Sequence, residues 1–272
     1  AGGVTFNHIA GNPETAPAGG YSITTLTGSA ANPIVFTGNG NTITAAAAPT
    51  AGSRTDAIFK IIGGDYITIQ NYVMTENPAN TTGGAIGVQQ MTEFGVALFA
   101  ASTTDGAQNN TIQNNTITMS SATTYQNAIG IFSTTASSST NGTQAAASIA
   151  GTNSNNKFYG NTISGVAHGF YFISPAQTAT VFESGNDIGG TSPATGNTIT
   201  YGISNTAGDL GFTSYSGTTP AGIYFRNVVG NSARYNTITS VATLTLASGG
   251  IFSANGTNPT GITYTTTISN NN

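Results

Sequence analysis

Carboxyl groups are the side chains of this 272-residue sequence that are best suited to acid–base chemistry. A pair of carboxyl groups beside a glycosidic bond can hydrolyse it, one acting as acid and the other as base or nucleophile. Glu183 and Asp187 are the closest acidic pair, in a long predicted loop, and are candidates for such a pair. The alternative is that both are solvated loop residues with roles in turns. The acidic residues are Glu14, Asp56, Asp65, Glu76, Glu93, Asp105, Glu183, Asp187 and Asp209.

A second candidate site combines Arg54, Asp56 and Glu93. Arg54 and Asp56 lie just before one predicted strand, and Glu93 lies just before the next equivalent strand. Successive repeats would bring these residues together. The alternative is a salt bridge at the rim, which contributes about 0 to 1 kcal/mol.

The two histidines, His8 and His168, have no neighbouring His or Cys with which to form a metal site. We therefore expect structural hydrogen-bonding roles for both. The Gly-Gly pairs in "IIGGDY" and "DIGGTS" are predicted to be turns, since neither is followed by a helix or by Lys-Ser/Thr. No catalytic, cofactor-binding or metal-binding residue is predicted, and a calcium requirement is left open.

The composition limits the partners that the chain can have. Charged residues make up 5% of the sequence, against about a quarter in ordinary soluble domains. Five basic residues cannot form a basic stripe, which argues against nucleic acid as a partner. No run of about 18 apolar residues occurs, so we expect no membrane insertion. There is no cysteine, and stability must come from packing and hydrogen bonds.

Two short motifs recur along the chain and indicate a repeat architecture. One is an Asn-Thr-Ile triplet, and the other is a short apolar strand led by small residues, as in "AIFKI", "AIGIF" and "AGIYF". The triplets are Asn41-Thr42-Ile43, Asn110-Thr111-Ile112, Asn115-Thr116-Ile117, Asn161-Thr162-Ile163, Asn197-Thr198-Ile199 and Asn236-Thr237-Ile238.

The stretch "NNTIQNNTITM" (109–119) carries the triplet twice, five residues apart. Residues on one face of a straight strand are an even number apart, so Ile112 and Ile117 can both face inward only if the chain bends between them. Corners starting at Asn71, Asn114, Gly160 and Tyr235 would supply such bends. We therefore predict an all-β parallel β-helix with three short strands per coil, about six or seven coils and irregular long loops.

Stacked coils align equivalent side chains. We predict an internal ladder of asparagines that bond from coil to coil, each bond contributing about 1 kcal/mol. Its predicted members are Asn71, Asn115, Asn161, Asn197 and Asn236. The predicted core residues are Ile112, Ile117, Ile163, Ile199 and Ile238.

The "NNTI" and "GIYF" coils resemble the right-handed parallel β-helix family, the pectin-lyase-like fold, over residues 55 to 272. The Thr-rich style of "NPIVFTGNGNTI" and of "AIFKIIGGDYITIQNYVMTEN" is similar to that of secreted surface proteins of Bacteroidota, which commonly leave the cell by type IX secretion. The resemblance implies an extracellular or cell-surface location. It also implies that active members carry Asp, Arg or Lys clusters on one strand face.

The expected organisation is an irregular or first-coil segment at residues 1–54, followed by the β-helix at 55–272. The last coil, "GITYTTTISNNN", ends without an amphipathic helix or polar cap. Because a bare solenoid end exposes strand edges, we expect the helix to continue beyond 272 or another subunit to cover its end. The expected partners are thus further domains of a longer chain or further subunits stacking there.

Surface features suggest two binding modes. Thr-x-Thr pairs at Thr42/Thr44, Thr116/Thr118, Thr198/Thr200 and Thr237/Thr239 would form an array of the kind that ice-binding proteins present. The alternative is the ordinary strand propensity of threonine, with Ser164 and the bulky loops interrupting the array. Loop aromatics could stack on glycans or a protein partner, or cover the solenoid. They are Tyr125, Phe182, Tyr201, Phe212 and Tyr215.

The function expected from these observations is that of a non-catalytic extracellular structural or adhesive segment of a bacterial surface protein or filament, a rigid rod that displays loops. Surface glycans are candidate ligands. One alternative is a polysaccharide-processing enzyme, a lyase or glycoside hydrolase, which would need two acids, or an acid with Arg or Lys, within about 10 Å in a groove. The other is an ice-binding surface.

Overall fold

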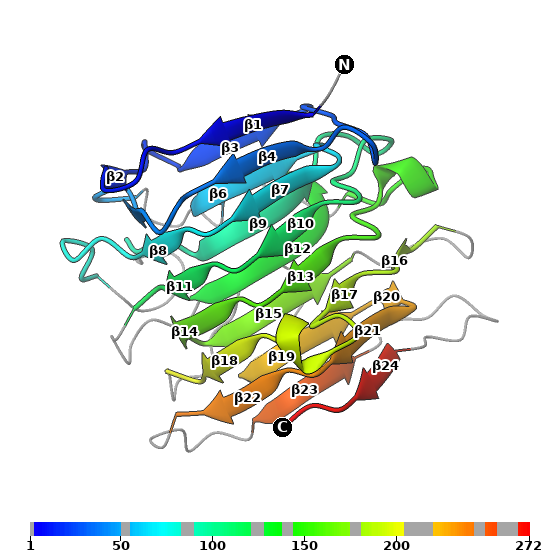
Figure 1. Ribbon diagram of the computed structural model, residues 1–272. Coiled ribbons are helices and arrows are strands. Elements are labelled where there is room, and N and C mark those ends of the chain that lie inside the picture. Colours follow the sequence, from blue (N-terminus) through cyan, green and yellow to red (C-terminus); the bar gives the residue numbers. More distant parts are fainter. Residues whose placement is uncertain are drawn as a thin grey trace.

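The computed structural model describes residues 3–49, 55–82, 90–120, 128–137, 144–174, 181–203, 220–241, 248–254 and 266–272. Strands stacked in parallel dominate it, and they run in order from the N-terminal to the C-terminal end of the molecule (Figure 1). Two short 3₁₀ helices, η1 (Ile149–Gly151) and η2 (Pro193–Thr195), interrupt the strands.

Three sheets, here called A, B and C, carry the fold. Sheet A contains β1 (Val4–Asn7), β4 (Ile34–Thr37), β7 (Ile67–Gln70), β10 (Thr111–Gln113), β13 (Lys157–Tyr159), β17 (Asp187–Ile188), β21 (Asn231–Arg234) and β24 (Thr266–Ser269). Sheet B contains β2 (Glu14–Thr15), β5 (Thr42–Thr44), β8 (Val73–Thr75), β11 (Thr116–Thr118), β14 (Thr162–Val166), β18 (Thr198–Tyr201) and β22 (Thr237–Ser240). Sheet C contains β3 (Tyr21–Thr24), β6 (Ala57–Ile62), β9 (Phe94–Ala100), β12 (Ile129–Ser137), β15 (His168–Ile173), β19 (Ala221–Arg226) and β23 (Gly249–Ala254). A small fourth pair joins β16 (Glu183–Ser184) and β20 (Val228–Val229).

The chain visits the sheets in the order A, B, C, and each strand pairs in parallel with the equivalent strand of the next coil. Because one strand per coil enters each sheet, the described residues make seven complete coils, with β24 beginning another. The fold is therefore the predicted all-β parallel β-helix with three strands per coil. Residues 1–54, expected as an irregular or first-coil segment, supply strands β1 to β5, and β3, β4 and β5 pair directly with the coil that follows.

The core fills the lumen enclosed by the three sheets. Alternate residues of each strand point inward, so one apolar side chain from each sheet B strand stacks on the next. Of the predicted core residues, Ile112, Ile117, Ile163 and Ile199 are fully buried. Ile238, near the last coil, is partly buried and packs against the same cluster.

Sheet C also has a buried outer face. Phe132, Tyr171, Tyr224 and Phe252 occupy equivalent positions on successive coils. The rings of Tyr171 and Tyr224 stack with centroids 4.5 Å apart, and those of Tyr224 and Phe252 are 5.1 Å apart. The stack is buried except at Phe252, which is 37% exposed.

Left-handed residues make the corners between sheets A and B. Asn71, Asn114 and Tyr235 have φ of 59°, 55° and 58°, and Gly160 has φ of 61°. One such residue turns the chain so that residues five positions apart, such as Ile112 and Ile117, both face the lumen. The bend explains why the Asn-Thr-Ile triplet is repeated so closely.

Candidate functional site

A ladder of asparagine side chains runs along the corner that precedes sheet B. The Nδ2 of Asn115 donates to the Oδ1 of Asn161 (3.2 Å), that of Asn161 to Asn197 (3.0 Å), and that of Asn197 to Asn236 (2.8 Å). Asn236 continues to the Oδ1 of Asn271 (3.0 Å). The same Oδ1 atoms accept the backbone N–H of the preceding ladder residue.

Each ladder Nδ2 also donates to a backbone carbonyl of the preceding coil. Asn115 donates to Ile69, Asn161 to Ile112 and Asn197 to Phe158, at 2.9 to 3.0 Å. These side chains are buried, so the bonds satisfy corner groups that water does not reach. Each Asn-Thr-Ile-Thr unit thus places Asn at the corner, Thr outward, Ile in the lumen and Thr outward again.

Asn71 is a correction to the predicted ladder, because it lies one position before the ladder site. Its side chain donates to Thr37 Oγ1, at 3.5 Å, and not to an asparagine of the ladder within the described residues, and its backbone is left-handed. Tyr72 occupies the ladder position of that coil, and its N–H donates to Asn115 Oδ1 at 3.0 Å. Asn41 occupies the site one coil earlier, donating to Ile9 O and accepting from Asn12 N. The corner has two residues, of which only the second points inward.

A second asparagine ladder, which sequence reasoning missed, follows the corner that precedes sheet A. The N–H of Asn110 donates to Asn156 Oδ1, that of Asn156 to Asn186 and that of Asn186 to Asn231, at 2.8 to 2.9 Å. The Nδ2 atoms of Asn110 and Asn156 donate to the Gly64 and Ala107 carbonyls. A signal was present, because Asn110, Asn156 and Asn231 each precede a residue of the first ladder by five positions.

Glu183, half of the first candidate acid pair, is enclosed by the solenoid. Its Oε1 accepts bonds from Ser133 Oγ (2.9 Å) and Asn186 Nδ2 (3.3 Å), and its Oε2 lies 3.5 Å from Ser174 Oγ. Burial raises the pKa of Glu183 to about 8, although these hydrogen bonds lower it. Glu183 is therefore a neutral acid near pH 7, bonded to neutral side chains.

Asp187, the other member of that pair, faces away from the lumen on sheet A. It accepts hydrogen bonds from Ser232, from Tyr159 OH at 2.7 Å and from Arg234 Nη2 at 3.3 Å. Partial burial alone would raise the pKa of Asp187, but these bonds outweigh it and hold the pKa below its ordinary value. The carboxyl of Glu183 lies in the lumen and that of Asp187 lies on the outer surface, so the two do not form a hydrolytic pair.

The second candidate site is a buried corner. Glu93 is 2% exposed, and its Oε2 accepts the backbone N–H of Asp56 at 3.1 Å. Burial, reinforced by the nearby negative charge of Asp56, raises the pKa of Glu93 well above its ordinary value. Arg54 lies outside the described residues. Glu93 therefore supports the backbone of the adjoining coil and does not lie at an open rim.

Both histidines have local structural partners. His168 is buried, its Nδ1 accepts the Ala221 N–H at 3.2 Å, and burial lowers its pKa to about 3, so it is neutral near pH 7. It contacts Tyr171 and Tyr224 edge to face. His8 lies 3.4 Å from Glu14 Oε1, and Tyr21 OH donates to Glu14 Oε2 at 2.7 Å. These three residues belong to the first coil: His8 follows β1, Glu14 lies in β2 and Tyr21 begins β3.

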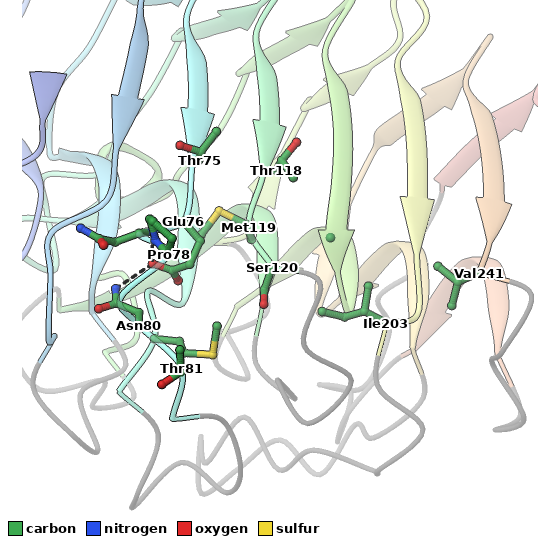
Figure 2. Close-up of a pocket in the computed structure, with 13 residues that line it drawn as sticks. Thr75, Glu76, Pro78, Asn80, Thr81, Thr118, Met119, Ser120, Ile203 and Val241 are labelled. Atoms are coloured by element: carbon green, nitrogen blue, oxygen red, sulfur yellow. Dashed lines mark hydrogen bonds between the residues drawn. The ribbon is translucent and has the colours of Figure 1, made fainter. Parts of the chain in front are cut away.

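A groove of about 780 Å³ runs along the end of sheet B (Figure 2). Thr75 and Thr118 form part of one wall, and Met119, Ile203 and Val241, which follow β11, β18 and β22, are the apolar residues farther along the groove. Glu76 is the carboxyl group of the lining. It accepts bonds from Asn77 N, Asn80 Nδ2 and Thr92 N at 2.8 Å, while burial raises its pKa.

The outer face of sheet B bears aligned threonines. One column contains Thr42, Val73, Thr116, Thr162, Thr198 and Thr237. The other contains Thr15, Thr44, Thr75, Thr118 and Ser164, and after a register shift it continues with Thr200 and Thr239. Ser164, predicted to interrupt the array, keeps a hydroxyl in the second column, and its Oγ lies 3.2 Å from Thr118 Oγ1. A bulge follows at Gly165, opposite β18.

The aromatic residues predicted for loops are not gathered at one place in the described structure. Tyr201 is 4% exposed and belongs to the core, and Phe182 is partly buried just before β16. Tyr125, Phe212 and Tyr215 lie outside the described residues. The longest run of stacked rings among the described residues lies instead on the outer face of sheet C, from Phe132 to Phe252.

Comparisons with known proteins gave no match: no family model covers the chain, and no curated protein or solved structure is significantly similar. Within the described ranges, no group of three or more His, Cys, Asp or Glu side chains is placed to hold a metal ion. Over the same residues, no helix has the length and apolar character needed to span a bilayer.

Proposed function

We propose that this chain is a non-catalytic structural or adhesive segment of an extracellular bacterial surface protein or filament. In this proposal the parallel β-helix is a rigid rod, and the segments that leave the coils are displayed along it. The proposal includes a pectin-lyase-like ancestry and export by type IX secretion in a member of the Bacteroidota. The first of these parts is based on the recurring "NNTI" and "GIYF" motifs, and the second on the Thr-rich style of the sequence.

The observation that carries the proposal is the continuity of the first asparagine ladder. Asn115, Asn161, Asn197, Asn236 and Asn271 bond without a break through five successive coils. Each step joins neighbouring coils by buried side-chain bonds in addition to three sheets of backbone bonds. A load along the rod is then shared among many parallel bonds in every coil, which suits a mechanical role.

The two ends of the described rod support stacking partners. Phe6 and Ile9 in the first coil are 50% and 76% exposed, and Ile268 in β24 is 50% exposed. Exposed apolar residues beside open strand edges favour pairing with further β structure. We propose that further coils of a longer chain, or further subunits, cover these ends.

An adhesive role would use the long sides of the rod. The groove beside sheet B spans several coils, and its described lining mixes hydroxyl, amide and apolar groups with the carboxyl of Glu76. Such a lining suits an uncharged elongated ligand, and surface glycans are our candidates. Nucleic acid and membrane insertion are not part of this proposal.

Electron microscopy of the native cell surface tests the structural role. Antibody against the recombinant chain should label fibres or a surface layer, and the isolated material should appear as rods or filaments. The proposal fails if the native protein is found as free monomers that cleave a polyuronide or a neutral glycan. That result would favour the polysaccharide-processing alternative.

A further inference from the structure

The outer face of sheet B is a two-dimensional array of small hydroxyl side chains. Within each strand, the two outward residues flank an inward one, as in Thr116-Ile117-Thr118. Thr116, Thr118, Thr162, Thr198, Thr237 and Thr239 are all exposed. The array is therefore open to solvent over the coils from β11 to β22.

The spacing of the array follows from strand geometry. Outward neighbours within a strand are about 6.7 Å apart, and equivalent residues on adjacent coils are about 4.8 Å apart. The prism face of hexagonal ice repeats its oxygen atoms at two perpendicular spacings close to these. A regular match over many coils requires a sheet with little twist, and sheets of that kind are stabilised by side-chain ladders.

The asparagine ladder supplies that restraint. Asn115, Asn161, Asn197 and Asn236 each directly precede the first threonine of a pair, and their bonds tie successive strands at that end. Within the described residues, the strands of sheet B from β5 to β22 contain no charged side chain. The first threonine column is thus held in register from β11 to β22, and both columns are electrically neutral, while a bulge after Ile163 shifts the second column between β14 and β18.

The chemistry of the face favours ordered water over a sugar. Threonine hydroxyls can bond to water, and the neighbouring methyl groups restrict the orientation of first-shell water. Flat sugar-binding faces depend on exposed aromatic rings. The outward positions in these same described strands hold threonine, serine and valine, and the nearest aromatic, Tyr201, is buried.

We propose that the outer face of sheet B binds ice, with Thr116, Thr162 and Thr198 at the centre of the binding surface. Water held between the threonine columns would join the ice lattice when the face meets a growing crystal. This inference is independent of the stacking role proposed above, because it concerns one long side of the rod. A rod that forms filaments but ignores ice would overturn only this inference.

The test measures adsorption to ice by the purified chain. When a single crystal is grown slowly from a dilute solution, the protein should be incorporated into the ice. It should also produce thermal hysteresis and inhibit recrystallisation. Thr162→Lys, at the centre of the array, should abolish most of the incorporation into ice, the thermal hysteresis and the inhibition of recrystallisation. The reason is that a charged side chain disrupts the ordered water.

Thr68→Lys is the matched control. Like Thr162, Thr68 lies on the outer face of the β-helix, but it belongs to β7 in sheet A. This variant should retain the wild-type thermal hysteresis. Thermal unfolding followed by circular dichroism would show that both variants are folded. Thr162→Val, which keeps the shape and removes the hydroxyl, should fall between wild type and Thr162→Lys.

Three results would overturn the proposal. One is a folded wild-type protein that stays in the liquid as the crystal grows, as an unrelated globular protein does. Another is equal loss of activity in Thr162→Lys and Thr68→Lys. The third is binding of the same face to crystalline cellulose or chitin without any effect on ice.

Discussion

Two of the three corners of each coil, those before sheet B and before sheet A, solve the same problem with different chemistry. At the corner before sheet B, the ladder residues bond side chain to side chain, and their partners are neutral. At the corner before sheet A, Asn110, Asn156 and Asn186 are linked by backbone-to-side-chain bonds. There the Nδ2 of Asn186 also donates to Glu183, a buried acid in the lumen.

The two ladders should therefore differ in how their stability depends on pH. The first ladder contains no group that titrates, so it should hold at any pH at which the chain is folded. The second ladder adjoins a carboxyl group whose charged form is disfavoured by burial. Of these two corners, the one before sheet A should therefore weaken in alkaline solution.

Glu183→Gln should have the largest effect on this comparison. Because burial raises the pKa of Glu183 from 4.5 to about 8, the folded protein holds a proton across that range that the unfolded chain releases. The free energy of unfolding of wild type should therefore fall as pH rises from 4.5 to 8, by at most about 5 kcal/mol, and then level off. Glutamine keeps the shape and stays neutral.

Chemical denaturation at a series of pH values measures this difference. The curves for wild type and Glu183→Gln should diverge above pH 4.5, with the variant more stable at pH 8 to 9. The remaining pH dependence of the variant reflects other buried acids, such as Glu93 and Glu76. Parallel curves for the two proteins would contradict the assignment of Glu183.

Alanine substitutions in the two ladders compare their strengths. The side chain of Asn161 takes part in four hydrogen bonds, with Asn115, Ile112 and Asn197. That of Asn156 takes part in two, with Asn110 and Ala107. At about 1 kcal/mol per bond, Asn161→Ala should cost about 4 kcal/mol and Asn156→Ala about 2 kcal/mol. Equal denaturation midpoints would show that the side-chain bonds of the first ladder add nothing.

Substitutions at Asn71 provide a smaller test, which compares a corner residue with a ladder residue. Its left-handed backbone tolerates glycine, so Asn71→Gly should change the free energy of unfolding by less than about 0.5 kcal/mol. Asn71→Ala should cost about 1 kcal/mol through backbone strain. Asn115→Ala should cost several times as much in the same denaturation experiment. A loss at Asn71 as large as that at Asn115 would place Asn71 within the ladder after all.

The smallest effect on stability is expected on the outer face of sheet B. Thr162 is exposed, and among the described residues no side-chain hydrogen bond joins it to the neighbouring coil. Thr162→Val should change the free energy of unfolding by no more than about 0.5 kcal/mol. A large loss of stability would mean that the threonines maintain the sheet, and that their regular spacing serves folding.

The sequence predicted the coil well, because its signal is local. Thr116, Ile117 and Thr118 alternate outward and inward, and the interval from Ile112 to Ile117 demands a corner. The position of Asn71 was wrong by one residue because both corner positions accept asparagine. Only the φ angle of Asn71 and the inward direction of Tyr72 distinguish them.

Contacts between coils were harder to predict. Glu183 and Asp187 are four residues apart, a spacing that would put them on one face of a straight strand. Gly185, with φ of 70°, and Asn186 form the corner between them, which turns Glu183 into the lumen and Asp187 outward. The stacking of Tyr171 on Tyr224 joins residues of neighbouring coils that are separated along the chain by β16, β17 and β18. No local pattern fixes that register.

The claim on which the rod and the ice-binding face both depend is that the threonine columns are straight and rigid. The chain has no cysteine, so Thr15→Cys and Thr239→Cys can place two spin labels at unique positions. These residues lie six coils apart, which corresponds to about 29 Å. Pulsed electron–electron double resonance should give one narrow distribution of distances between the two spin labels, centred near that value. A broad distribution, or one centred far from it, would contradict the account.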